Sequence, residues 1–197
     1  MISRAAVFLL AALSGACAEL VVPPLELESD SRPQAGSDAS AAFQLSGRIA
    51  VAHNGESFSG SLRWRHDEGG DEIFILSPMG QGIARITHNS AGASLETAEG
   101  QGYRADDVES LTDEVLGWRL PVDGLQYWIV GQSAPDRWVE SQQDDDQRHI
   151  ATLRQDGWRI DYQGYRSVQG TQLPAKMEMT MGDRLRVRLV IDNWVLP

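Results

Sequence analysis

The sequence has a single cysteine, Cys17, among its 197 residues. One thiol cannot form a disulfide within the chain. The four histidines (His53, His66, His88 and His149) stand far apart, and no pair has the spacing of zinc ligands. The sequence also lacks the nucleophile elbow, the Walker loop and the dinucleotide-binding fingerprint. We therefore predict neither an enzyme nor a metal or cofactor site, although catalytic residues that meet only in the folded chain would leave no such motif.

Basic residues are scarce, with 17 Lys and Arg against 28 Asp and Glu, so the net charge is -11. This balance excludes nucleic acid as a partner, because a phosphate binder needs a basic face. It also argues against an electrostatic hold on anionic lipid. The acidic run at 144–146 lacks the Gly and Glu spacing of a calcium loop, so we interpret it as a solvated turn. Any membrane contact is thus expected to use apolar groups or a covalent lipid.

Long hydrophobic runs are missing as well. The run at 5–13 follows Arg4 and has nine residues, which is too short to span a bilayer. Small residues at 14–16 then lead to Cys17. This arrangement is typical of an export signal and resembles a bacterial lipobox, although Ser14 stands where Leu is usual. We predict that residues 1–16 are a lipoprotein signal peptide and that Cys17 carries the lipid; the alternative is ordinary cleavage near Ala16 or Ala18 that leaves a free thiol.

The segment after the signal is expected to be a tether. Ala18 follows the cysteine, at the position where an Asp tends to retain lipoproteins at the inner membrane in enteric-type sorting, so this residue points, by resemblance, to the outer membrane. Residues 19–42 are rich in Pro, Ser and acidic side chains and have too little apolar surface to fold. A flexible coil of this length reaches about 25–30 Å. Residues 17–42 are therefore interpreted as a lipidated cysteine and a flexible acidic tether.

A folded domain is predicted over residues 43–197, where apolar and polar residues begin to alternate with period two. Phe43, Leu45, Ile49 and Val51 share one strand face in the first run. The last run has the same pattern, with Leu185, Val187, Leu189 and Ile191 on one face and three arginines on the other. The strands expected from this pattern cover 43–51, 58–65, 73–76, 82–87, 93–97, 101–104, 137–142, 149–154, 158–162, 177–181 and 185–191.

Two short helices are predicted between the sixth and seventh strands. The first begins at Asp106, with Glu109 as the partner in a loose capping box, and Gly117 ends it. The second follows Pro121 and ends at Gly131. Apolar residues recur at helical spacing in both, so each helix has one face to bury. These residues are Val108, Leu111, Val115 and Leu116 in the first helix and Val122, Leu125, Trp128 and Ile129 in the second.

The fold class that follows is mostly β. A single antiparallel sheet of about 11 strands tends to curl or close. We therefore predict an unclosed antiparallel β-barrel with a short helical lid over its apolar interior. The candidate cavity-lining residues are Leu62, Trp64, Leu111, Val115, Leu125, Ile129, Met177 and Met179. Methionine repacks around variable shapes such as alkyl chains, but the same residues would also suit a solid core, and the pattern leaves both interpretations open.

The stretch at 73–87 is expected to form a β-hairpin with Ser-Pro-Met-Gly-Gln between its arms. Pro78 suits an early corner of a turn and Gly80 a later one with positive φ, which leaves Met79 at the tip. Met79 either folds back into the core or forms an exposed apolar finger that touches lipid or an apolar partner.

These segments resemble, in one order, the outer-membrane lipoprotein receptor of the lipoprotein localisation pathway, the LolB family. The resemblance covers Phe43 to the C-terminus. Any one of its motifs would be weak alone, but their order is specific. The motifs are GRIAV at 47–51, GSLRW at 60–64, LSPMG at 76–80, YRADD at 103–107, LPV at 120–122 with Leu125, WIVG at 128–131 and IDNW at 191–194.

The resemblance implies an unclosed barrel with a helical lid over an apolar cavity. It implies a monomeric receptor, lipid-anchored in the inner leaflet of the outer membrane and facing the periplasm, that accepts acylated lipoproteins from a soluble LolA-like carrier and inserts them into that membrane. The family has a protruding loop with an exposed hydrophobic residue, typically Leu, and Met79 between Pro78 and Gly80 takes that place here. Two other classes remain open: an envelope lipoprotein that binds lipid or scaffolds a complex without transfer, and an envelope hydrolase.

Overall fold

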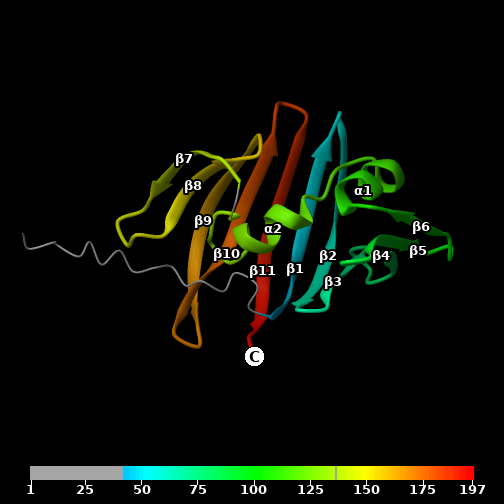
Figure 1. The fold of residues 1–197 in the computed structure, drawn as a ribbon, viewed down its shortest axis with the longest axis horizontal. Coiled ribbons are helices and arrows are strands. Elements are labelled where there is room, and N and C mark those ends of the chain that lie inside the picture. Colours follow the sequence, from blue (N-terminus) through cyan, green and yellow to red (C-terminus); the bar gives the residue numbers. More distant parts are fainter. Residues whose placement is uncertain (1–41, 136) are drawn as a thin grey trace, which may run out of the picture. The chain divides into compact units, whose positions relative to one another are not determined.

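The computed structural model describes residues 42–135 and 137–197. The predicted signal peptide at 1–16, Cys17 and the tether up to residue 41 lie outside the described residues. The described chain forms eleven strands and two helices (Figure 1). In chain order these are β1 (Phe43–His53), β2 (Glu56–Asp67), β3 (Gly70–Leu76), β4 (Gly82–Asn89), β5 (Gly92–Thr97), β6 (Gly102–Ala105), α1 (Val108–Leu116), α2 (Val122–Trp128), β7 (Val139–Asp144), β8 (Ile150–Gln155), β9 (Trp158–Val168), β10 (Thr171–Met181) and β11 (Leu185–Val195).

All eleven strands belong to one antiparallel sheet in the order β6-β5-β4-β3-β2-β1-β11-β10-β9-β8-β7. Each strand pairs with its neighbour in sequence, and the first and last strands pair in the middle. In the described chain the edge strands β6 and β7 do not pair with each other, so the sheet is not closed. The prediction of a mostly β, antiparallel and unclosed fold with two helices is confirmed.

Alternation along the strands separates an inner from an outer face. In β1 the residues with the parity of Phe43 are buried and most of those between them are exposed. The inner residues of the sheet join the apolar faces of both helices in one core, and Figure 1 shows α1 and α2 lying across one face of the sheet. Gly47 lies at a register shift in β1, where a Cβ would collide with the carbonyl oxygen of Val190 on β11. Glycine is therefore required for this close approach.

The first helix begins one residue later than the sequence predicts. The N-cap is Asp107, whose carboxylate accepts a hydrogen bond from the backbone N–H of Ser110 at 2.8 Å. This bond lowers the pKa of Asp107. The expected pair of Asp106 and Glu109 is thus wrong, because the side chain that reaches the free N–H groups belongs to Asp107. Gly117 ends the helix in the left-handed conformation as predicted, with φ of 77°.

The second helix and the seventh strand also differ from the predicted bounds. α2 ends at Trp128, with Ile129 as its C-cap, so the helix stops short of the predicted end at Gly131. β7 begins at Val139 and reaches Asp144, two residues later at each end than predicted. None of the described helices is long and apolar enough to cross a membrane.

Candidate functional site

The β3–β4 loop holds Met79 away from the protein surface. Ser77 accepts a backbone hydrogen bond from Gly80 at 2.9 Å, and its own N–H donates to the carbonyl oxygen of Gln81 at 2.8 Å. Pro78 therefore occupies the first corner of a β-turn and Met79 the second. Gly80 has φ of 83°, a conformation that strains any residue with a Cβ. The loop is thus fixed by its own hydrogen bonds rather than by contacts of the methionine side chain.

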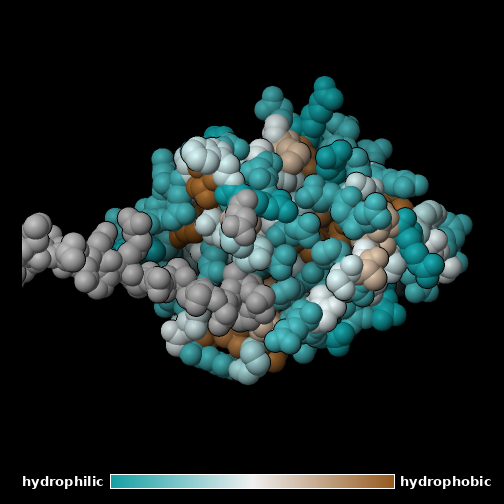
Figure 2. Space-filling view, viewed as in Figure 1, coloured by the Kyte–Doolittle hydropathy of each residue, from teal (hydrophilic) through white to brown (hydrophobic). Residues whose placement is uncertain are grey.

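Met79 is 90% exposed, more than any other large hydrophobic residue in the described chain. The interpretation that it folds back into the core is therefore wrong, because its turn points away from the core. Trp138, in the segment before β7, is 82% exposed and was not singled out from the sequence. Figure 2 shows that the side of the molecule bearing the helices is mainly hydrophilic, with hydrophobic residues emerging in separate places. An isolated exposed apolar side chain is common, but one on a rigid turn is suited to contact with an apolar partner.

An apolar pocket of about 290 Å³ lies between the end of α1 and strands β1 to β4. Its apolar walls come from both the sheet and the helix, whereas the polar residues His53, Glu56 and Ser57 lie together near the β1–β2 turn. The apolar lining residues are Val51, Phe58, Ile75, Ile83, Val115, Leu116 and Trp118. The pocket can therefore surround an apolar group while its polar end stays beside water.

A buried threonine connects α1 to the segment that follows it. Thr112 is fully buried and accepts a hydrogen bond from the backbone N–H of Leu120 at 2.9 Å. This bond fixes the turn that contains Trp118, which covers the pocket and is itself buried. On the same helix, burial raises the pKa of Glu109. Packing thus holds the apolar side of this short helix against the sheet, and the Thr112 bond joins the helix to the segment that carries Trp118.

The end of α2 is held by a buried amide, Gln155, at the end of β8. Its Oε1 accepts from Trp128 Nε1 and from the N–H of Ala134, both at 2.8 Å. Its Nε2 donates to the carbonyl oxygen of Ala134 at 2.9 Å. Tyr162 adds a hydroxyl bond to the carbonyl oxygen of Trp128 at 2.8 Å, and burial raises the pKa of this tyrosine. These bonds attach the end of the helix to β8 and β9.

Replacing Gln155 by Ala is expected to destabilise the fold by about 2–4 kcal/mol, because the buried N–H groups of Trp128 and Ala134 lose their acceptor. Urea denaturation followed by tryptophan fluorescence measures the change. The matched control is Gln163→Ala on the exposed face of β9, where a change below about 0.5 kcal/mol is expected. Equal effects of the two substitutions would show that Gln155 is not what holds the helix.

At the start of α2, Val122 is buried in the core, and the polar contacts there are a row of charged side chains on the helix-bearing side of the sheet. Nε2 of His88, on β4, lies 3.8 Å from a carboxylate oxygen of Asp123, on α2. Arg137 lies 3.8 Å from Asp123 and 2.6 Å from Asp156 in the β8–β9 turn. The hydrogen bond to Asp156 raises the pKa of Arg137. Partly exposed ion pairs contribute little to stability, so these polar contacts hold α2 less firmly than the buried hydrogen bonds of Gln155 do.

The row of charged side chains at the start of α2 continues from His88 to Asp71 on β3, whose carboxylate is buried. It accepts a hydrogen bond from Trp64 Nε1 at 2.8 Å. Nδ1 of His66 lies 2.8 Å from one of its oxygens and Nδ1 of His88 3.4 Å from the other. Across residues 42–135 and 137–197, no group of three or more His, Cys, Asp and Glu residues is arranged to hold a metal ion. We interpret Asp71 as the acceptor that orients Trp64 inside the sheet.

With this geometry established, comparison with known proteins identifies the family. The family model described as "Outer membrane lipoprotein LolB" matches residues 41–194. The chain belongs to the LolB family. It is 37% identical over 182 residues to the outer-membrane lipoprotein LolB of Nitrosomonas europaea, covering 91% of this chain and 82% of that one. It is 41% identical over 154 residues to the LolB of Pseudomonas aeruginosa strain PAO1, covering 78% of this chain and 74% of that one.

Solved structures agree on the fold. A LolA superfamily protein from Nitrosomonas europaea superimposes with a TM-score of 0.54 at 11% identity, covering 80% of this chain and 87% of that one. An outer membrane lipoprotein-sorting protein domain from Vibrio parahaemolyticus gives a TM-score of 0.52 at 9% identity, covering 79% and 85%. Membership of the LolB family makes this chain an outer-membrane lipoprotein receptor of the lipoprotein localisation pathway and not an enzyme.

The eight candidate cavity residues of this LolB-family chain are divided between the lid helices and the inner face of the sheet. Val115 lines the pocket, and it is half-buried. The other seven, Leu62, Trp64, Leu111, Leu125, Ile129, Met177 and Met179, are buried in the core between helices and sheet. Sequence reasoning did not find Trp118 or Gln155. A tryptophan directly after the helix-ending Gly117 is the signal that could have indicated Trp118, whereas nothing in the sequence marks Gln155 as buried.

Proposed function

We propose that the chain receives acylated lipoproteins from a soluble periplasmic carrier of the LolA type and inserts them, as a monomer, into the inner leaflet of the outer membrane. The observation that carries this proposal is the exposed Met79 on a rigid turn in a domain that also has a covered apolar pocket. A domain that only stored lipid would have a use for the pocket but none for the exposed tip. Family membership supports the same role.

Movement of an acylated lipoprotein from the carrier to the membrane is slow if its acyl chains have to pass through water. Each buried CH₂ group is worth about 0.8 kcal/mol, so a sixteen-carbon chain is worth roughly 12 kcal/mol. No nucleotide is needed if the acyl chains exchange one apolar surface for another and each acceptor binds them slightly better than the last. The proposed receptor therefore keeps the acyl chains in apolar contact between the carrier and the bilayer.

The pocket has to enlarge for this task. At about 290 Å³ it lies at the lower end of the range for small-ligand sites, about 300–1,000 Å³. The polar contacts at the end of α2 are the buried hydrogen bonds of Gln155, whereas those at its start are weak ion pairs beside the buried Val122. We therefore expect the lid to open from the side of these ion pairs. The buried candidate residues on the inner side of the helices, such as Leu111 and Leu125, then become part of the acyl-binding surface.

The proposed anchor is the lipid on Cys17, which places the receptor on the periplasmic side of the outer membrane. A tether of about 24 residues reaches roughly 25–30 Å. This distance keeps the domain beside the membrane and still accessible to the carrier. The acidic character of the chain, with a net charge of -11, suits recognition of a basic patch on that carrier.

Val115→Glu tests the pocket. A carboxylate at this half-buried position of α1 is expected to weaken binding of a fluorescent fatty acid at least about tenfold, because burying a charge beside the acyl chain is costly. Fluorescence titration measures the affinity, and a second assay follows handover of a lipoprotein from the carrier. Gln143→Glu adds the same charge on the exposed edge strand β7 and should change neither. If Val115→Glu binds the fatty acid as well as the parent does, the acyl site lies elsewhere. If the unsubstituted chain binds the fatty acid but accepts no lipoprotein from the carrier, the protein stores lipid and does not transfer it.

A further inference from the structure

The outer face of the sheet, opposite the helices, is basic although the chain is acidic. On the six strands from β4 through β10 in sheet order, the outward side chains include seven basic and four acidic residues. This gives an excess of three positive charges on a chain whose net charge is -11. The basic residues are Arg48, Arg63, Arg65, Arg85, Lys176, Arg186 and Arg188, and the acidic ones are Asp67, Glu72, Glu178 and Asp192.

Two partly buried carboxylates on this face, those of Glu72 and Glu178, each form ion pairs with two arginines. Glu72 contacts both Arg65 and Arg85, and its side chain is only 19% exposed. Glu178, 18% exposed, contacts both Arg186 and Arg188. The four guanidinium groups are about half exposed, so each carboxylate lies beneath two cations and leaves part of their charge facing water.

The centre of the face has arginines on three adjacent strands, β2, β1 and β11. Arg63 makes no ion pair within residues 42–135 and 137–197, and Arg48 pairs with Asp192 while remaining 65% exposed. Arg63 lies directly across from Phe74 on β3, and the guanidinium of Arg85 lies 5.5 Å from the Phe74 ring. The face thus has guanidinium groups on several neighbouring strands, with carboxylates between some of them and one partly exposed aromatic ring.

We propose that this outer face docks on the anionic, phosphate-bearing surface of a lipid bilayer. Arginine presents a planar fork of N–H donors that matches phosphate oxygens in pairs, and six of the seven basic residues are arginine. Juxtamembrane basic residues are attracted to anionic lipid head groups. The inference rests on the proposed function only for the presence of a membrane beside the protein.

A protein partner fits this face less well. The centres of protein–protein interfaces are depleted of charge and contain apolar anchor residues. Of the four large hydrophobic residues that are exposed in the described chain, two lie on the strands of this face with the side chain outward: Phe74 on β3, which is 36% exposed, and Val195 at the end of β11, which is 58% exposed and lies opposite Gln44. A flat array of cations with two separate apolar side chains, one of them at the end of a strand, is better suited to a lipid surface than to a folded partner.

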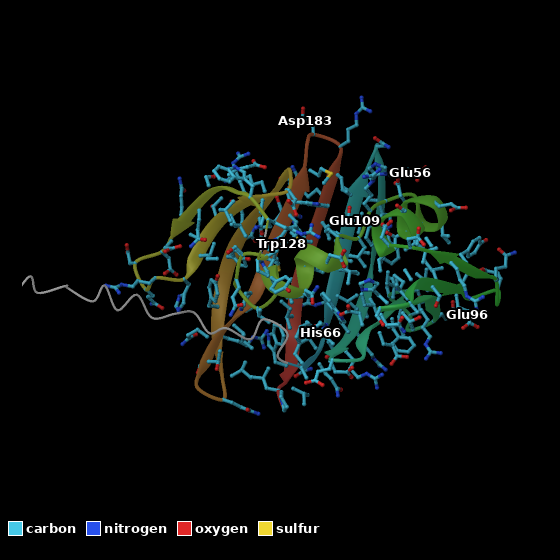
Figure 3. All side chains as sticks on the ribbon, viewed as in Figure 1. Glu56, His66, Glu96, Glu109, Trp128 and Asp183 are labelled. Carbon is cyan, nitrogen blue, oxygen red and sulfur yellow. The ribbon has the colours of Figure 1, made fainter. Side chains whose placement is uncertain are left out.

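The negative net charge does not prevent this contact. Many acidic groups lie at strand ends, as Figure 3 shows for Glu56 and Asp183 at the end of the sheet opposite His66. β2 has 12 residues and spans about 40 Å. The Debye length is about 10 Å at 0.1 M salt, so charges at the ends of the strands are largely screened from the middle of the face. The expectation from composition, that the chain has no electrostatic hold on anionic lipid, therefore does not apply to this face.

Vesicle sedimentation of the full chain bearing Cys17→Ala tests the proposal without a covalent anchor. We expect the protein to sediment with phosphatidylglycerol vesicles at about 50 mM salt and to be released at about 500 mM. It should not bind phosphatidylcholine vesicles. The triple variant Arg63→Gln, Arg65→Gln, Arg186→Gln should reduce binding at least about tenfold. It is designed so that Glu72 keeps Arg85 and Glu178 keeps Arg188.

The matched control removes three exposed arginines that lie outside the strands: Arg119→Gln, Arg148→Gln, Arg184→Gln. It changes the net charge equally and should bind nearly as well as the parent. Equal losses in the two triple variants, or equal binding to both kinds of vesicle, would overturn the proposal. Carrier-to-receptor handover measured without vesicles reports on the proposed function separately, so failure of one inference is distinguishable from failure of the other.

Discussion

Replacing Met79 by Glu is expected to leave acceptance of lipoprotein from the carrier intact and to slow insertion into the membrane about 10- to 100-fold. Burying a methionine side chain is worth about 1.5–3 kcal/mol, and a carboxylate in its place has to be desolvated instead. The side chain is 90% exposed, so the substitution removes no packing and the fold should stay unchanged. Co-sedimentation of the cargo with vesicles after a wash at high salt measures insertion, and co-purification with the receptor measures acceptance.

Two variants make this result specific. Met79→Leu keeps an apolar tip of similar size and should insert cargo normally. Trp138→Glu adds a carboxylate at a position of comparable exposure and should also insert normally. If Met79→Glu inserted at the parental rate, or if Trp138→Glu were equally slow, the exposed tip of the β3–β4 loop would have no special role.

Replacing Cys17 by Ala is expected to convert the membrane protein into a soluble periplasmic one. The argument is the size of the acyl contribution, which is roughly 12 kcal/mol for a chain of sixteen carbons. Cell fractionation with a wash at about 500 mM salt measures the outcome, since that salt also releases the weak contact expected of the outer sheet face.

Ser14→Leu provides the comparison for Cys17→Ala. It brings the signal closer to the usual lipobox and keeps the cysteine, so the protein should stay with the outer membrane. Retention of the Cys17→Ala protein in salt-washed membranes would show that the anchor is not an acyl group on this cysteine. Release of both variants would point instead to cleavage near Ala16 or Ala18.

Much of the fold could be predicted because its contacts are local. Nine of the ten strand pairings join consecutive strands across a short connection, and alternation of apolar residues shows which side faces inward. The tip position of Met79 follows from Pro78 and Gly80 alone, since both constrain φ within one turn. Where two acidic residues compete to cap a helix, as Asp106 and Asp107 do, sequence spacing does not decide, because the choice depends on a dihedral angle outside the helix.

The rest depends on contacts between distant residues. The pairing of β1 with β11 places Gln44 beside Val195. Gln155 on β8 becomes buried because it contacts Trp128 on α2, which lies 27 residues earlier in the chain. Polar residues with such partners look like surface residues in the sequence. The basic outer face could not be predicted from composition for a related reason. Composition gives only the sum of all charges, whereas folding places the arginines at alternate strand positions on one side of the sheet. The cavity predicted for Leu62, Met177 and their neighbours remains a prediction for the open lid.

The most direct test of the account follows cargo transfer from carrier to vesicle through this receptor with an apolar scavenger, lipid-free serum albumin, in the water between them. If the acyl chains pass from one apolar surface to the next and leave the receptor at Met79, the transfer rate should be unaffected by the scavenger. A rate that falls as albumin increases, with cargo accumulating on the albumin, would contradict the account.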